Sequence, residues 1–139
     1  MQEKLDLSVL ARAIATLKVA LDEYQKDPSN EFVRDSCIQR FEYSYDLSTK
    51  MIRRYLSLVA ANPGEVQEMS FQSLIREAYT LGIVENSWDQ WWEYRDNRNK
   101  TSHGYNRDTA IEIVEGLPRF YQEADFLLQA LTEKNEDQV

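Results

Sequence analysis

The amino-acid sequence predicts an all-α protein, built as an antiparallel up-down bundle of four to five helices. Apolar residues recur in steps of three and four through nearly the whole chain, and no stretch alternates with the period of two that is typical of strands. The 139 residues are 42% apolar with four Gly and three Pro, which is neither a disordered nor a fibrous composition. We expect a single domain over residues 1–139, because this length closes one core.

The first two predicted helices are separated by a short polar break. One apolar face defines the first helix, and its residues are Leu10, Ile14, Leu17, Leu21 and Tyr24. The cluster Asp27-Pro28-Ser29-Asn30 ends that helix and caps the second, which we expect from about Asn30 to about Ala61. Asn62-Pro63-Gly64 stops the second helix. Its apolar arc is wide enough to need several neighbours, so we interpret it as the central helix and a candidate subunit interface.

Two shorter helices follow. Ser70 is placed to cap the third, and Gly82 stands where the glycine after a helix end belongs. Ser87 and Gln90 match a capping box that opens the fourth helix. Four aromatic residues lie at its start, namely Trp88, Trp91, Trp92 and Tyr94. We interpret these rings as core residues, with stacking on nucleic-acid bases as the alternative.

The last predicted helix begins at a cap supplied by Asn106 or Asp108 and ends near Lys134. Pro118 falls inside its apolar pattern. Proline lacks the backbone N–H that an interior helix position donates, so we expect a kink near residues 115–118. Residues 134–139 are polar and are predicted to be a frayed tail.

Composition excludes several classes of function. The four glycines lie far apart, so the chain has no phosphate-binding P-loop and no dinucleotide fingerprint. One Cys and one His are too few for the common zinc sites, and no Glu-x-x-His occurs for a di-iron centre, so we expect neither metal nor cofactor. No apolar run is long enough to span a membrane, and early charges break any signal peptide. The lone Cys37, read as a core residue, suits a cytoplasmic protein.

One segment, residues 95–107, carries the chemistry. It holds four Arg or Lys and one Asp, a net charge of +3, in a chain whose net charge is −8, so the remainder carries −11. Phosphate is the ligand that such a segment favours, since Arg presents a planar fork of donors; a solvated helix face is the alternative. Arg95, Asn99 and His103 line one helical face, and Arg98 and Ser102 form an adjacent row. Gly104 is a plausible helix end, which leaves His103 in the last turn.

These residue types suit cleavage of a phosphodiester. An imidazole serves as acid or base, and a guanidinium neutralises charge that develops on phosphate oxygens. RNA fits better than DNA, because its 2′-hydroxyl is a built-in nucleophile and no metal is then needed. The alternative for a lone His103 is a structural role.

The stretch from Arg98 to Tyr105 resembles the Arg-x4-6-His-x-Tyr motif of HEPN domains. Residues 41–54 and 74–83 resemble two further blocks of one HEPN branch, the nucleotidyltransferase substrate-binding proteins, and the likeness runs from about Leu5 to about Leu131. The resemblance implies a helical homodimer paired with a minimal nucleotidyltransferase (MNT). In such toxin–antitoxin pairs the HEPN member is a metal-independent ribonuclease that the MNT member neutralises.

The resemblance also implies residue roles. Arg98 stabilises the transition state, His103 is the acid/base, Asn99 orients one of them or the phosphate, and Tyr105 accepts AMP from the partner enzyme. Four further polar residues of the segment are predicted to bind the RNA substrate, namely Arg95, Lys100, Ser102 and Arg107. Gly104 departs from the pattern, since a side-chain residue is common there, and this loosens the geometry between His103 and Tyr105.

Three functions remain open on the sequence. The first is the ribonuclease toxin, the second a non-catalytic subunit that docks a nucleotidyltransferase and presents or accepts a nucleotide, and the third a helical dimer whose basic patch binds acidic proteins. A further charged cluster has two interpretations and comprises Glu42, Asp46, Lys50, Arg53 and Arg54. It forms either ordinary pairs along one helix or a tether that reaches Arg95 or Arg98 across the bundle.

Overall fold

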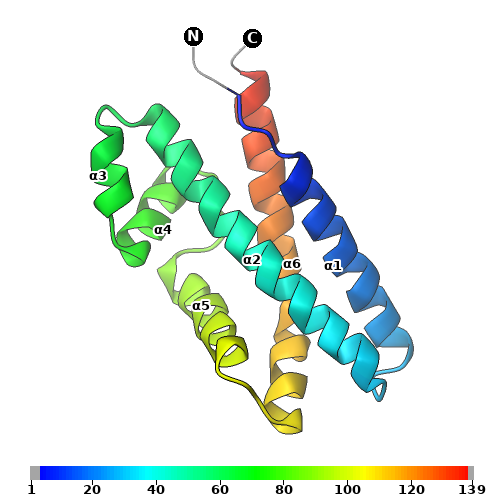
Figure 1. Cartoon of the computed structure of the whole chain (residues 1–139). Helices are drawn as coiled ribbons and strands as arrows, with labels where there is room; N and C mark the ends of the chain where they lie inside the picture. The colour runs from blue at the N-terminus through cyan, green and yellow to red at the C-terminus, as the bar shows by residue number, and fades with distance from the viewer. Residues whose placement is uncertain (1–3, 138–139) are drawn as a thin grey trace.

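The computed structural model describes residues 4–137, which form six helices and no strand. The helices are α1 (Ser8–Lys26), α2 (Glu31–Val59), α3 (Pro63–Glu68), α4 (Phe71–Thr80), α5 (Trp88–Ser102) and α6 (Arg107–Glu136). The prediction of an all-α bundle is confirmed. Helix α2 crosses the middle of the molecule and packs against every other helix, as expected of the central one (Figure 1). Helices α1 and α2 run antiparallel, and so do α5 and α6 (Figure 1).

The extra helix, α3, arises where the sequence pattern predicted only a stop. Helix α2 does end before Asn62-Pro63-Gly64, but the same residues also begin α3. The Asn62 side chain accepts a hydrogen bond from the Gly64 N–H at 3.1 Å, and Pro63 occupies the first helical turn. Asn at the cap and Pro at the first helical position are start signals as much as stop signals, which explains the difference.

Most helix ends follow the predicted local chemistry. The side chains of Asn30, Ser70 and Asn106 cap α2, α4 and α6 by accepting backbone N–H groups. Helix α5 does begin after Ser87, as predicted. The predicted capping box does not form, because the Ser87 side chain makes no cap hydrogen bond. Its intended partner Gln90 is engaged elsewhere, donating to Glu93 and accepting from Arg119.

Helix α6 continues through Pro118 without a break and extends past its predicted end near Lys134 to Glu136. The Asn135 side chain holds this end against the start of the chain. Its Nδ2 donates to the Leu5 carbonyl at 2.9 Å, and its Oδ1 accepts from the Leu5 N–H at 3.0 Å. Residues 134–136 are therefore an ordered helix end, whereas residues 138–139 of the predicted tail lie outside the described residues.

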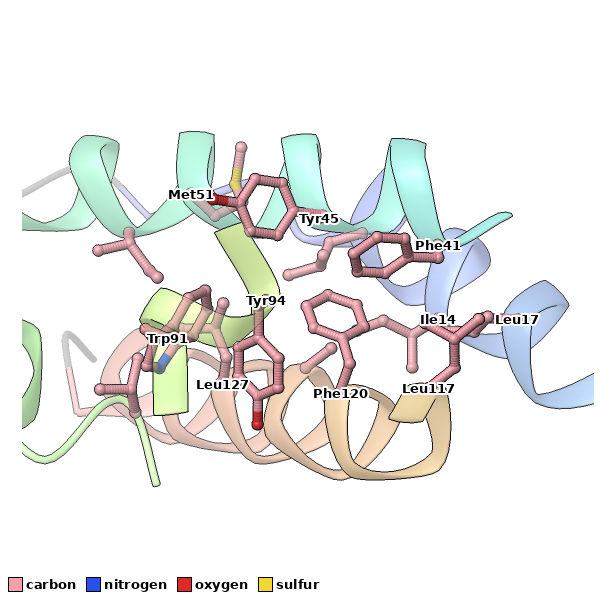
Figure 2. Close-up of a cluster of buried hydrophobic side chains, with 14 of the residues drawn as sticks. Ile14, Leu17, Phe41, Tyr45, Met51, Trp91, Tyr94, Leu117, Phe120 and Leu127 are labelled. Atoms are coloured by element: carbon pink, nitrogen blue, oxygen red, sulfur yellow. The ribbon is translucent and has the colours of Figure 1, made fainter. Parts of the chain in front are cut away.

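An aromatic cluster occupies the core between α2, α5 and α6 (Figure 2). Phe120 of α6 meets Phe41 of α2 edge-on at 5.0 Å and Tyr94 of α5 at 5.3 Å between ring centroids. Trp91 packs edge-on against Tyr94 at 5.2 Å. The interpretation of Trp91 and Tyr94 as core residues therefore matches the structure, whereas Trp92 is half exposed. None of the helices in residues 4–137 has the length and apolar character needed to cross a bilayer.

Candidate functional site

The site begins where α5 ends. Ser102 is the last residue of the helix, His103 follows as its C-cap, and Gly104 adopts φ +81°. This left-handed conformation is strained for any residue with a Cβ, so Gly104 is what allows the chain to turn sharply here. Asn106 starts α6 two residues later. The turn exposes His103 and Tyr105 to solvent at the junction of two helices.

An open hollow of about 460 Å³ lies at this junction. We call it the His103 hollow, and its lining residues are Asn99, Lys100, His103, Gly104, Tyr105, Asn106, Thr109 and Glu112. It brings together four of the residues that the sequence predicted for the site, namely Asn99, Lys100, His103 and Tyr105. One ammonium group, one imidazole and several amide and hydroxyl groups face the same space, together with the Glu112 carboxylate. The donors among these groups suit a phosphate-bearing ligand, whereas Glu112 opposes its charge.

Arg98 points away from this hollow, toward α2. Its Nε and Nη2 donate to Oδ1 and Oδ2 of Asp46, both at 3.0 Å, and its Nη1 donates to Oε2 of Glu42 at 3.1 Å. Within a single chain, Arg98 and His103 therefore do not line the same hollow. The reason is helical geometry, because residues five apart on an α-helix point about 140° apart.

The charged cluster of α2 therefore follows the second of its two interpretations. Glu42 and Asp46 reach across to Arg98 instead of pairing along their own helix. The hydrogen bonds that Arg98 donates to Asp46, and then the negative charge of Asp46, raise the pKa of Arg98 despite its partial burial. Arg53, in contrast, donates to the carbonyls of Val66 and Met69 and so holds α3 in place.

Tyr105 lies in the field of the same acidic helix. Burial, and then the charges of Asp35 and Glu42, raise the pKa of its phenol. The Tyr105 phenol is therefore neutral at physiological pH. Its side chain lines the His103 hollow on one side and faces residues of α2 on the other.

The other predicted RNA-binding residues are dispersed. The Arg95 guanidinium lies over the Phe71 ring, 5.5 Å from its centroid. The Ser102 hydroxyl donates to the Arg98 carbonyl at 3.0 Å, which closes the last turn of α5. Arg107 lines a second hollow, on the other side of Tyr105. Only Lys100 faces the His103 hollow, and it also pairs with Asp96 at 3.1 Å.

The second hollow, of about 190 Å³, lies on the other side of Tyr105. We call it the Arg34 hollow, and its lining residues are Glu31, Arg34, Asp35, Tyr105, Asn106, Arg107 and Ala110. Sequence analysis missed Arg34. Nothing in its local pattern marks it, because the residues that close this hollow opposite α2, from Tyr105 to Ala110, lie more than seventy residues away in the chain.

Comparisons with known proteins agree with this architecture. A family model described as "Nucleotidyltransferase substrate binding protein like" matches residues 5–133. The chain belongs to this family. The resemblance to HEPN/MNT-type proteins is thereby confirmed.

Two comparisons match this chain to Haemophilus influenzae. The protein named "Probable ribonuclease HepT" is 33% identical over 144 residues, which span 98% of this chain and 98% of the relative. A solved structure, described as revealing the fold of a substrate binding domain of a nucleotidyltransferase, is 30% identical, with a TM-score of 0.84 over 91% of this chain and 99% of that chain. Within residues 4–137, no group of three or more His, Cys, Asp or Glu side chains is arranged to hold a metal ion.

Proposed function

We propose that this protein is a cytoplasmic ribonuclease toxin, which a partner minimal nucleotidyltransferase neutralises. The single observation that carries the proposal is the near full-length similarity to a protein named as a ribonuclease. The basic segment supports it, because Asn99, Lys100 and His103 line one hollow at the end of α5. His103 is the single histidine of the chain, so the imidazole that the proposal needs can come only from this hollow.

The chemistry proposed here is transesterification within the RNA strand. The 2′-oxygen attacks the adjacent phosphorus, its proton passes to the His103 imidazole, and the bond from phosphorus to the 5′-oxygen breaks. The departing 5′-oxygen takes a proton from a second imidazole, and the other product is a 2′,3′-cyclic phosphate. Arg98 neutralises charge on the phosphoryl oxygens.

This mechanism calls for two copies of the chain. Each copy has one His, and its Arg98 and His103 face different sides of α5. A two-fold axis beside α5 would bring the imidazole of one copy toward the guanidinium of the other and double both groups. We therefore propose a homodimer as the active form.

Neutralisation is proposed to act on Tyr105. Its phenolic oxygen attacks the α-phosphorus of ATP on the partner enzyme, pyrophosphate leaves, and the phenolic proton passes to solvent. The AMP so attached would extend into the His103 hollow, which Tyr105 lines, and would block the RNA. The exposed position of Tyr105 supports this role.

The decisive experiment is His103→Ala. We expect the wild-type protein, expressed alone, to arrest growth and to cleave RNA in vitro, and the variant to lose at least 10²-fold in cleavage rate. Gln129→Ala, at an exposed position on α6, is the control and should behave as wild type. A wild-type protein that leaves both growth and RNA unaffected would refute the ribonuclease proposal.

A second candidate function is a non-catalytic subunit that docks the nucleotidyltransferase. The solved relative supports it, because that protein is described as a substrate binding domain of such an enzyme. Incubation with the partner and ATP, followed by native and intact-mass spectrometry, tests it directly. A stable complex without RNA cleavage by the free protein favours this candidate, and the absence of both complex and AMP adduct excludes it.

A further inference from the structure

Arg34 is a buried arginine that has no carboxylate partner among residues 4–137. Its residue is 3% exposed, its Nη2 donates to the Pro28 carbonyl at 3.2 Å, and its Nε has no hydrogen-bond partner among the described residues. A buried guanidinium is costly unless it is paired and hydrogen-bonded. The exposed acids nearest in sequence, Glu31 and Asp35, form no ion pair with it. The donor set of Arg34 is therefore incomplete in the free protein.

The Arg34 hollow is also where two helices begin. Helix α2 contributes its first turns, and α6 contributes its cap Asn106 and its first residue Arg107. The first backbone N–H groups of a helix carry partial positive charge and favour anions. Arg34 and Arg107 add two positive charges against the two carboxylates of Glu31 and Asp35. The two carboxylates are exposed whereas Arg34 is buried, so solvent screens them more than it screens Arg34.

The Arg34 hollow adjoins the His103 hollow. Tyr105 and Asn106 line both, so a ligand passing over the Tyr105 ring would reach from one to the other. An RNA strand has this form, with a phosphate on each side of a base and a base face that stacks on an aromatic ring. Stacking on Tyr105 places one phosphate near His103 and the neighbouring phosphate near Arg34.

We propose that the Arg34 hollow is an RNA subsite, which binds the phosphodiester next to the scissile one. Arg34 and Arg107 donate to its oxygens, assisted by the partial positive charge at the starts of α2 and α6. Three of the backbone N–H groups there already donate to the Asn30 and Asn106 side chains. This inference rests on the proposed ribonuclease function, and it adds Arg34 to the residues that contact RNA.

The test measures RNA binding without cleavage. In a His103→Ala background, the affinity of a short single-stranded RNA is followed by fluorescence anisotropy at several salt concentrations. Arg107→Gln and Arg34→Met should each weaken binding about tenfold. Each should also lower the slope of log K against log salt by about 0.7, the value for one lost phosphate contact on a single strand.

The controls separate the outcomes. Arg54→Gln, at an exposed position of α2 away from both hollows, removes the same charge and should change affinity little. Circular dichroism verifies folding of Arg34→Met, and Arg107→Gln serves if that variant does not fold. Affinity and slope equal to the control overturn the subsite while the ribonuclease proposal stands. If the His103→Ala parent protein binds no RNA, both the subsite and the ribonuclease proposal are overturned. If the Arg34 and Arg107 variants bind RNA normally but no longer accept AMP from the partner enzyme, the hollow binds a nucleotide and the RNA subsite is overturned.

A separate observation concerns Arg98. The Nε and Nη2 atoms of its guanidinium each donate a hydrogen bond of 3.0 Å to Asp46. The Nη1 atom donates to Glu42 at 3.1 Å and to the hydroxyls of Thr101 and Ser102 at 3.3 and 3.5 Å. The Asp46 edge is the fixed one, because both of its bonds are short and paired. The Nη1 end has the longer contacts, which a phosphate oxygen can replace. The geometry assigns Asp46 as the positioning residue that aims Nη1 of Arg98 at the substrate, again on the basis of the proposed ribonuclease.

Asp46→Ala tests this assignment. Its kcat should fall on the order of 10²-fold with KM little changed, because a misaimed group loses mainly transition-state stabilisation. Asp46→Asn keeps one side-chain oxygen that can accept from Arg98, so its kcat should lie between those of Asp46→Ala and the wild type. Glu133→Ala, at an exposed position of α6, is the control and should behave as wild type. A kcat equal to wild type, or above it, overturns the positioning role. The Nε–H resonance of Arg98 in NMR spectra reports its hydrogen bond to Asp46 directly. If that hydrogen bond is present but the protein cleaves no RNA, only the catalytic proposal is overturned.

Discussion

Trp91→Ala should lower the free energy of unfolding by about 3–5 kcal/mol, the range typical of a large aromatic residue removed from a core. Trp91 is fully buried and packs against Tyr45 and Tyr94 (Figure 2). Its ring also lies edge-on to that of Phe71, at 6.4 Å between centroids. It is one of only three buried residues in α5, so its packing is what holds the helix that carries Arg98 and His103. Urea unfolding followed by circular dichroism measures the effect.

Trp92 provides a matched control for this prediction. It is the same residue type, one position along the same helix, and it is 52% exposed. Trp92→Ala should cost less than about 1 kcal/mol, because surface substitutions rarely cost more. Equal losses at the two positions would show that α5 is not anchored through Trp91.

Glu123→Ala should destabilise the fold by about 2–4 kcal/mol. The Glu123 carboxylate is fully buried and accepts four hydrogen bonds, from the backbone N–H of Glu85 at 2.6 Å, the N–H and Nδ2 of Asn86 at 3.3 and 2.9 Å, and the Tyr94 hydroxyl at 3.3 Å. It thereby ties α6 to the connection before α5 and to α5 itself. Alanine leaves these donors without an acceptor, and each buried orphan costs about 1–3 kcal/mol. Urea unfolding measures the loss of stability, and Glu115→Ala, at an exposed position of α6, is the control.

The same carboxyl group predicts a pH dependence. Burial raises the pKa of Glu123 above its ordinary 4.5, and hydrogen bonds from Asn86 and Glu85 oppose that rise. The folded state therefore binds this proton more tightly than the unfolded state. The resulting contribution to stability is present below pH 4.5 and is lost as the pH rises through the raised pKa. Glu123→Gln should remove this component of the pH dependence, and a variant with an unchanged profile would contradict the assignment.

Local signals predicted most of the helices. Asn30, Ser70 and Asn106 act on backbone groups two or three residues away, and Gly82 and Gly104 take the positive φ that a helix end favours. Such signals depend on neighbours in the chain, so a single sequence contains them. The same signals were ambiguous at Asn62-Pro63-Gly64, where one motif served as both a stop and a start.

The candidate site was predicted in part for the same reason. His103, Asn99 and Lys100 are neighbours on the last turns of one helix, and helical spacing alone groups them. The direction of Arg98 was not predictable in this way, because its partner Asp46 lies 52 residues earlier in the chain. Either interpretation of the α2 charges was consistent with their spacing, and only the packing of α5 beside α2 selected one.

The sequence by itself determined the helical class, most of the helix ends, the basic segment and the family, because these follow from short-range spacing, composition and motif. Only the tertiary structure decided which groups meet. Leu5 pairs with Asn135 across 130 residues, Glu123 receives donors from 29 to 38 residues away, and Arg34 shares a hollow with the start of α6. These contacts depend on how whole helices pack against each other, and packing is the sum of many weak interactions that no local pattern records.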